Sequence, residues 1–224
     1  MKIAVVHGQA HKGNTYNVTH LLLEQLECNK EDIKEFNVNG ISPCVGCTQC
    51  ILKDENLCPH RDMTEPIIKA LEEADVIILD SPNYCMGMSG QLKTFCDHLG
   101  YRWMSHRPYD MRKKIGVAIS TTAGAGASKT TKAIGNQMTW WSVGRVYQLA
   151  FTVMAQKWDE INEKRIKKLN IKVRRLAAKI NRTAGKVKPC IKTRIFFKFM
   201  TLMHKNAVWS EIENEYWKKN GWIG

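Results

Sequence analysis

Five short apolar runs alternate with stretches of helical periodicity along the first 155 residues. The runs are 2–7, 33–38, 76–81, 115–121 and 146–154, and the first, third and fourth contain almost uninterrupted apolar segments. Strands that are buried on both faces of a parallel sheet have this composition. We therefore predict five parallel strands.

Helical patterns fill the spaces between these runs. Apolar residues recur at helical spacing over 18–26, a second helix is expected to start at Thr64, and Ser89 is a candidate N-cap for a third. Two more helices are expected over 126–141 and 159–179. Alternating strands and helices of these lengths predict a three-layer α/β fold with a parallel sheet in the order 2-1-3-4-5.

The chain has 224 residues, of which 44% are hydrophobic and 25% charged, values that suit a globular domain and exclude a disordered or collagen-like chain. We expect one domain over 1–184 and an extension over 185–224 that packs on this domain or on a partner subunit. The extension comprises a linker, an amphipathic stretch over 191–203 and a Trp-rich end over 209–223.

The net charge of +13 is concentrated in one segment. Between Lys157 and Lys205 lie 16 of the 34 basic residues but only three of the 21 acidic ones, so the remaining chain, with 18 of each, is neutral. We expect apolar residues of 161–180 to pack on the sheet while the basic ones face water. Coverage of a partner subunit by 191–203 is the next interpretation. An anionic membrane or a nucleic acid is the least favoured, and we expect no nucleic-acid partner.

Targeting signals are not evident. The apolar stretch 3–6 is too short for a signal peptide, and the run 195–203 is broken by Lys198 and cannot span a bilayer. We therefore expect a cytoplasmic protein without a transmembrane segment. In that compartment the eight cysteines, four of them within fifteen residues, indicate metal or redox use rather than a disulfide scaffold.

Candidate chemistry begins in the loop 8–15, between the first strand and the first helix. Amides at a helix N-terminus and the Thr15 hydroxyl can hold an anion, and Lys12 adds positive charge. The spacing resembles a triphosphate-binding loop, but Asn14 stands where that motif needs lysine. A phosphate monoester is the better ligand, and an ordinary β-to-α turn is the alternative.

Two more loops, 81–90 and 121–127, follow the third and fourth strands. Their small residues allow backbone to approach a flat ring, and main-chain N–H groups can bind its polar edge. All three loops lie at the carboxyl ends of strands, where open α/β sheets bind ligands.

The stretches 2–15, 43–63, 81–97 and 121–126 resemble the NADPH-dependent FMN reductase group of flavodoxin-like proteins, particularly its iron–sulfur flavoprotein branch. The resemblance implies a flavodoxin-like fold with FMN as cofactor. It implies a phosphate site formed by Gln9, His11, Lys12, Gly13, Asn14 and Thr15. It implies an isoalloxazine site formed by Ser81, Pro82, Asn83, Tyr84, Met86, Thr121, Thr122, Ala123 and Gly124. The family usually has Ser-Pro-Arg where this chain has Gln9-Ala10-His11.

Cys44, Cys47, Cys50 and Cys58, the last followed by Pro59, resemble the compact iron–sulfur motif of that branch. Three thiolates two residues apart can wrap one face of a cubane, and a fourth closes the site, which would hold a [4Fe–4S] cluster. Similar loops also occur in relatives without a cluster. A zinc ion and plain or paired thiols are therefore alternatives.

These features predict an FMN-dependent NAD(P)H oxidoreductase. A nicotinamide would stack on the flavin and pass a hydride to N5, and electrons would continue to a quinone, a nitro compound, free flavin or a protein. No side-chain acid or base is required, and His98 and His106 have no partner evident in the sequence, so we assign no catalytic residue. A homodimer or higher homo-oligomer is expected because flavins in this fold often lie near a dimer interface. The alternatives are a non-catalytic electron-transfer protein and a flavin-free interaction domain with structural zinc.

Overall fold

The computed structural model describes residues 1–206 and 210–224 and contains one five-stranded parallel sheet. The strands are β1 (Ile3–His7), β2 (Ile33–Asn37), β3 (Val76–Asp80), β4 (Ile115–Thr122) and β5 (Arg145–Thr152). Their spatial order is β2-β1-β3-β4-β5, and every neighbouring pair is parallel. This confirms the predicted strands and their order.

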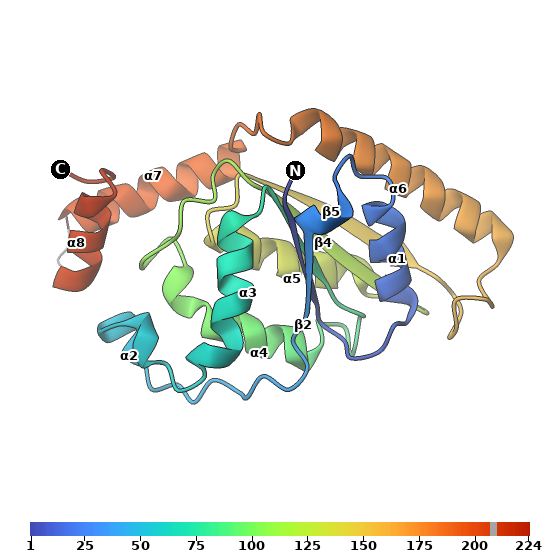
Figure 1. Ribbon diagram of the computed structural model, residues 1–224, viewed down its shortest axis with the longest axis horizontal. Helices are drawn as coiled ribbons and strands as arrows, with labels where there is room; N and C mark the ends of the chain where they lie inside the picture. The colour runs from blue at the N-terminus through green and yellow to red at the C-terminus, as the bar shows by residue number, and fades with distance from the viewer. Residues whose placement is uncertain (207–209) are drawn as a thin grey trace.

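Helices cover both faces of the sheet (Figure 1). Helices α1 (Asn14–Leu23) and α6 (Glu163–Thr183) pack on one face, and α3 (Arg61–Glu73), α4 (Gly90–His98) and α5 (Ala127–Trp140) pack on the other. Alternate residues of one strand point to opposite faces, so Ile3 and Val5 join the first cluster while Ala4 and Val6 join the second. A sheet covered on both sides explains the unbroken apolar runs of β1 and β3.

The helix starts agree in part with the sequence pattern. Ser89 caps α4, because its hydroxyl oxygen accepts a hydrogen bond from the backbone N–H of Leu92 at 3.2 Å. The expected start of a helix at Thr64 is wrong, since α3 begins at Arg61. Thr64 lies inside the first turns of α3, where its hydroxyl donates to the carbonyls of His60 and Arg61, each at 3.3 Å.

The long connection between β2 and α3 carries the clustered cysteines. It contains one turn of α-helix, α2 (Gln49–Leu52), and one short 3-10 turn, η2 (Glu55–Leu57). Two further 3-10 turns, η1 (Lys30–Asp32) and η3 (Gly100–Arg102), lie elsewhere in the chain. The connection runs along the end of the molecule that carries α4 (Figure 1).

The C-terminal part of the chain continues as helices. Basic helix α6 buries Leu169, Val173, Leu176 and Ile180 against the sheet, as expected. Helix α7 (Ile191–Asn206) covers the predicted amphipathic stretch, and α8 (Glu211–Lys219) follows it. Position 209, the first of the expected Trp-rich end, lies outside the described residues.

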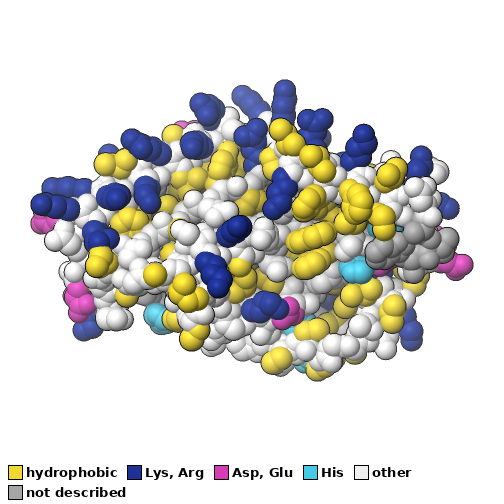
Figure 2. All heavy atoms as spheres, turned by 180° about the vertical axis from the view of Figure 1, so that it is seen from behind, with side chains coloured by type: hydrophobic (Ala, Val, Ile, Leu, Met, Phe, Trp, Pro, Cys, Tyr) yellow, Lys and Arg dark blue, Asp and Glu magenta, His cyan; other side chains and the backbone are white. Residues whose placement is uncertain are grey.

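A separate apolar cluster joins these last helices to the chain after α4. It contains the buried side chains of Met104, Phe197, Trp217 and Ile223. Figure 2 shows lysine and arginine side chains gathered along the edge of the molecule that α6 and α7 form. Among the described residues, none of the helices combines the length and apolar character needed to cross a bilayer.

Candidate functional site

The carboxyl ends of β1, β3, β4 and β5 surround one open cleft of about 570 Å³. It gathers twelve of the fifteen side chains expected around a flavin. The first loop contributes Gln9, His11, Lys12, Gly13, Asn14 and Thr15, and the other two contribute Pro82, Asn83, Tyr84, Thr121, Thr122 and Ala123. Because the strands are parallel, loops that are far apart in the sequence meet at this edge.

The other three expected residues lie outside the lining of this cleft. Ser81 is completely buried, and its hydroxyl donates to the Pro82 carbonyl and accepts from the Ser89 N–H, both at 2.8 Å. Met86 lies half-exposed at the tip of a turn. The Gly124 N–H points to the Thr122 hydroxyl at 3.3 Å. These three positions shape the loops rather than the wall of the cleft.

Sequence reasoning missed the loop after β5. Asn17 and five residues of 153–158 also line the cleft, namely Val153, Ala155, Gln156, Lys157 and Trp158. The Asn14 amide binds this loop by donating to the carbonyls of Ala155 at 3.4 Å and Gln156 at 3.2 Å. The sequence contained a signal for this loop, because a fifth parallel strand must also end at this edge. The loop was missed because the fifth strand was expected to continue to residue 154.

The N-terminus of α1 opens into the cleft. Gly13 occupies the N-cap position, and no side chain caps the helix. The first amides of a helix have no partner within the helix and carry the positive end of its dipole. Beside them, the Thr15 and Thr121 hydroxyls lie 2.7 Å apart, so one hydroxyl still has a proton to donate. Such an arrangement suits a phosphate group.

Gln9 offers the cleft an acceptor rather than a donor. Its Nε2 donates to Oδ1 of Asp80 at 3.0 Å, which fixes the orientation of the amide. Its Oε1 is buried and has no hydrogen-bond partner, and the same is true of Oδ1 of Asn14. Unpaired buried acceptors favour a ligand with hydroxyl or N–H donors. A sugar-alcohol chain would supply those donors, whereas a phosphate dianion would not.

A buried polar network lies beneath Gln9. Asp80 is completely buried and accepts hydrogen bonds from Nδ1 of His7 at 2.7 Å and the Thr19 hydroxyl at 2.6 Å. The other His7 nitrogen lies 2.9 Å from Oε2 of Glu35. Burial lowers the pKa of His7, but the hydrogen bonds and charges of Asp80 and Glu35 outweigh burial and raise it. The raised pKa favours the protonated form of His7 beside the Asp80 side chain.

The second and third loops form one connected wall. The Asn83 side chain donates to the Ala125 carbonyl at 2.9 Å and accepts from the Thr130 hydroxyl at 2.7 Å. Gly126 has a φ of +103°, and a Cβ there would lie 2.7 Å from the Asn83 amide nitrogen. Only glycine fits this approach. The wall is thus held in place without any ligand.

A strained turn forms the rim of that wall. Tyr84 and Gly87 exchange backbone hydrogen bonds of 3.0 and 2.9 Å. Between them, Cys85 and Met86 both have left-handed backbone conformations, with φ values of +47° and +65°. Side-chain-bearing residues adopt this conformation at an energetic cost, and such strain gathers at functional sites.

The four clustered cysteines line a second, small pocket together with His60 and His98. Cys44 and Cys47 are exposed, whereas Cys50 and Cys58 are partly buried. Burial, and then the neighbouring thiols, raise the pKa of Cys50. Among the described residues, no three of the sulfurs lie within 4.8 Å of one another.

The residue types of this pocket fit more than one metal group. Four cysteine thiolates can bind one tetrahedral zinc ion or the four irons of a cubane cluster. The four thiols that line the pocket would therefore suit a metal group of either kind.

The structure also supplies partners for two histidines that have none evident in the sequence. Nε2 of His98 lies 2.8 Å from the Ser42 carbonyl, and its Nδ1 lies 3.9 Å from the Cys58 sulfur. Nδ1 of His106 lies 2.8 Å from Oε1 of Glu213 in α8. Both partners are distant in the sequence, so a local pattern could not reveal them.

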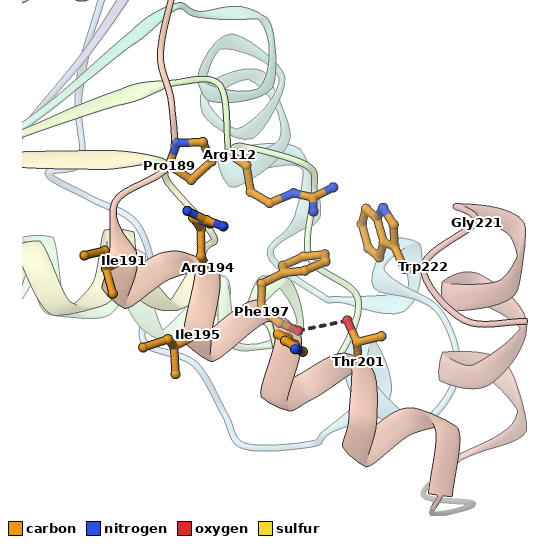
Figure 3. A pocket seen from close by; sticks show the side chains of 10 residues that line it. Arg112, Pro189, Ile191, Arg194, Ile195, Phe197, Thr201, Gly221 and Trp222 are labelled. Carbon is orange, nitrogen blue, oxygen red and sulfur yellow. Dashed lines mark hydrogen bonds between the residues drawn. The ribbon is translucent and has the colours of Figure 1, made fainter.

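A larger cavity of about 860 Å³ lies away from both sites, beside α7 (Figure 3). The Arg112 guanidinium lies 4.0 Å from the centre of the Phe197 ring and points between this ring and Trp222. None of the residues expected to hold a flavin or a metal lines this cavity. It is therefore not part of the cleft at the strand ends.

Similarity to known proteins identifies the family to which the chain belongs. The sequence signature of the family described as NADPH-dependent FMN reductase matches residues 1–159. The chain belongs to this family. As a member of the NADPH-dependent FMN reductases it is an oxidoreductase, and the family supports FMN as its cofactor.

Two relatives of this chain are both named iron–sulfur flavoproteins. An iron–sulfur flavoprotein from Archaeoglobus fulgidus is 27% identical over 230 residues, covering 100% of both chains. An iron–sulfur flavoprotein from Methanocaldococcus jannaschii is 34% identical over 148 residues, covering 61% of this chain and 70% of the relative. Among solved structures, a flavone reductase shares the fold with a TM-score of 0.59 and 15% identity, over 85% of this chain and 66% of its own.

Proposed function

We propose that this protein binds FMN in the cleft at the strand ends, accepts reducing equivalents from NADH or NADPH, and passes them to a further acceptor. One observation carries the proposal: twelve residues from three loops, nominated from sequence alone, meet in one cleft beside an uncapped helix N-terminus. When bound, FMN would supply the redox chemistry by accepting a hydride at N5.

The first loop would bind the phosphate and the ribityl chain. Backbone amides at the start of α1, with Lys12, favour the phosphate. The buried acceptors of Gln9 and Asn14 favour the ribityl hydroxyls. This division departs from the phosphate role that the family resemblance implies for Gln9 and Asn14.

The second and third loops would hold the isoalloxazine ring. Asn83 fixes the wall that would hold the ring, and Tyr84 stands half-exposed at the rim. Because the cleft is open, a nicotinamide would have access to a ring held there. Hydride transfer between two stacked rings requires orientation rather than a side-chain acid or base, so the protein's role is to bind and orient.

The cysteine loop would hold a [4Fe–4S] cluster through Cys44, Cys47, Cys50 and Cys58. Support comes from the four cysteines that line one pocket and from the names of the two relatives. When bound, the cluster would supply one-electron redox chemistry. Protein or small-molecule acceptors, a homodimer or higher homo-oligomer and a cytoplasmic location stay predictions.

Flavin binding gives the sharpest test. We expect FMN to bind at least tenfold more tightly than riboflavin, measured by quenching of flavin fluorescence, because only FMN has a phosphate for the α1 amides. Lys12→Met should weaken FMN binding and leave riboflavin binding unchanged, with Lys129→Met as the control. Equal affinities for both flavins, or no flavin uptake, would sink the proposal.

Two further measurements separate the alternatives. Anaerobic mixing of the FMN-loaded protein with NADH or NADPH should bleach the flavin by two electrons, and an absence of bleaching would favour the electron-transfer protein. Metal analysis of anaerobically prepared protein should give four irons and four sulfides per chain. One zinc per chain, or neither metal, would exclude the cluster.

A further inference from the structure

Arg107 binds the cysteine loop from inside the protein. Its side chain is only 4% exposed. Nη1 donates to the Ile51 carbonyl at 3.0 Å, and Nη2 donates to the Cys50 carbonyl and to Oε2 of Glu55 at 3.1 Å. One guanidinium therefore binds two carbonyls within the short helix α2 and the carboxylate of Glu55 that follows this helix.

The loop cannot satisfy these groups by itself. Helix α2 is a single turn, so its last carbonyls have no partners in a following turn. The planar guanidinium offers several N–H donors in a fixed geometry, which matches two carbonyls and a carboxylate. Glu55 lies between Cys50 and Cys58 in the sequence, and it also lies 3.7 Å from Arg102. Without Arg107, two carbonyls and this carboxylate would lose a buried partner.

Helix α8 holds the backbone on either side of Arg107. The Trp217 indole donates to the His106 carbonyl at 2.6 Å, and the Tyr216 hydroxyl donates to the Pro108 carbonyl at 2.8 Å. Trp217 is completely buried, and Glu213 pairs with the His106 ring. The C-terminal extension therefore fixes the segment from which Arg107 reaches the cysteine loop.

We propose that Arg107 is a positioning residue for Cys50 and Cys58, and that α8 acts on the cysteine site through Arg107. The proposal rests on the proposed function only in that the loop holds a metal group. These two partly buried thiols would be set in place before metal binds, whereas Cys44 and Cys47 are exposed. The extension thus has a role at the cysteine site although it contributes no ligand to it.

Thiol accessibility in the metal-free full chain tests the first step. Alkylation by iodoacetamide is followed at each cysteine by mass spectrometry, with Cys28 as the internal reference. Arg107→Met should raise the alkylation rate of Cys50 and Cys58 about tenfold relative to Cys28, because the loop detaches. Arg174→Met, which removes an exposed arginine of α6, should change nothing.

A double-variant cycle tests the link to α8. Trp217→Phe keeps an aromatic ring but loses the donor to His106, and it should raise Cys50 alkylation about threefold. Combined with Arg107→Met it should add nothing further, since α8 acts through Arg107. A multiplicative effect of the two changes would overturn that link, because α8 would then act independently.

The outcomes separate this inference from the proposed cluster. A folded Arg107→Met protein in which Cys50 is alkylated at the wild-type rate overturns the positioning role of Arg107. If that variant does not fold, Arg107→Lys takes its place. We then expect the alkylation rate of Cys50 to rise about threefold, and an unchanged rate again overturns the role. After anaerobic incubation with iron and sulfide, wild-type protein should retain cluster absorbance and Arg107→Met should lose it faster. A wild-type protein that retains no metal refutes the cluster and leaves the alkylation result standing.

Discussion

Replacement of Asp80 by asparagine tests the buried network beneath the cleft. The carboxylate is completely buried and accepts hydrogen bonds from His7, Gln9 and Thr19 at 2.7, 3.0 and 2.6 Å. In Asp80→Asn the amide group faces donors and the charge of His7 loses its counterion. Loss of one member of a buried, hydrogen-bonded ion pair costs about 3–5 kcal/mol. We expect a loss of that size in the free energy of unfolding at pH 6.

The raised pKa of His7 also predicts how the free energy of unfolding changes with pH. Because the pKa of His7 is raised above 6.5 in the folded protein, its contribution to stability is complete below pH 6.5. It is lost as the pH rises through the folded value, with a slope of at most about 1.4 kcal/mol per pH unit. Without Asp80 the main cause of the raised pKa is gone. The difference in stability between wild type and variant should therefore shrink as the pH rises above 6.5.

Urea unfolding of the flavin-free protein, followed by tryptophan fluorescence, measures both quantities. Flavin is left out because a ligand that binds only the folded state adds its own stabilisation. Asp97→Asn is the matched control, since this exposed carboxylate pairs with Lys93 across one helical turn and should change stability by less than about 1 kcal/mol. A loss below about 1 kcal/mol in Asp80→Asn, or a difference that grows with pH, would refute the reasoning.

Two other predictions concern close packing and thiol reactivity. Gly8→Ala should lower the free energy of unfolding by about 2–4 kcal/mol in the same urea assay, because a Cβ there would lie 2.8 Å from the Asp80 carbonyl oxygen. Gly90→Ala, where a Cβ meets open space, is the control and should change it by less than about 1 kcal/mol in either direction. Burial raises the pKa of Cys96 to about 12, so at pH 8 iodoacetamide should alkylate it roughly a thousandfold more slowly than Cys44. Equal alkylation rates for these two thiols would contradict that prediction.

Much of the fold was determined by local patterns. Strands β1, β3 and β4 are buried on both faces, so their apolar runs mark them directly in the sequence. Alternation with helices then leaves few connections other than parallel ones, and parallel strands bring all their carboxyl ends to one edge. For that reason the loops 8–15, 81–90 and 121–127 could be nominated together.

Tertiary structure alone decided how those loops are completed. The orientation of the Gln9 amide depends on Asp80, 71 residues away. The hydrogen bonds that position the cysteine loop come from Arg107, 57 residues from Cys50. The hydrogen bond that joins α8 to the segment of Arg107 spans 111 residues, from His106 to Trp217. Hydrogen-bond partners at such separations leave no periodic trace in a sequence, because they follow from how packed elements meet and not from the conformation of either segment.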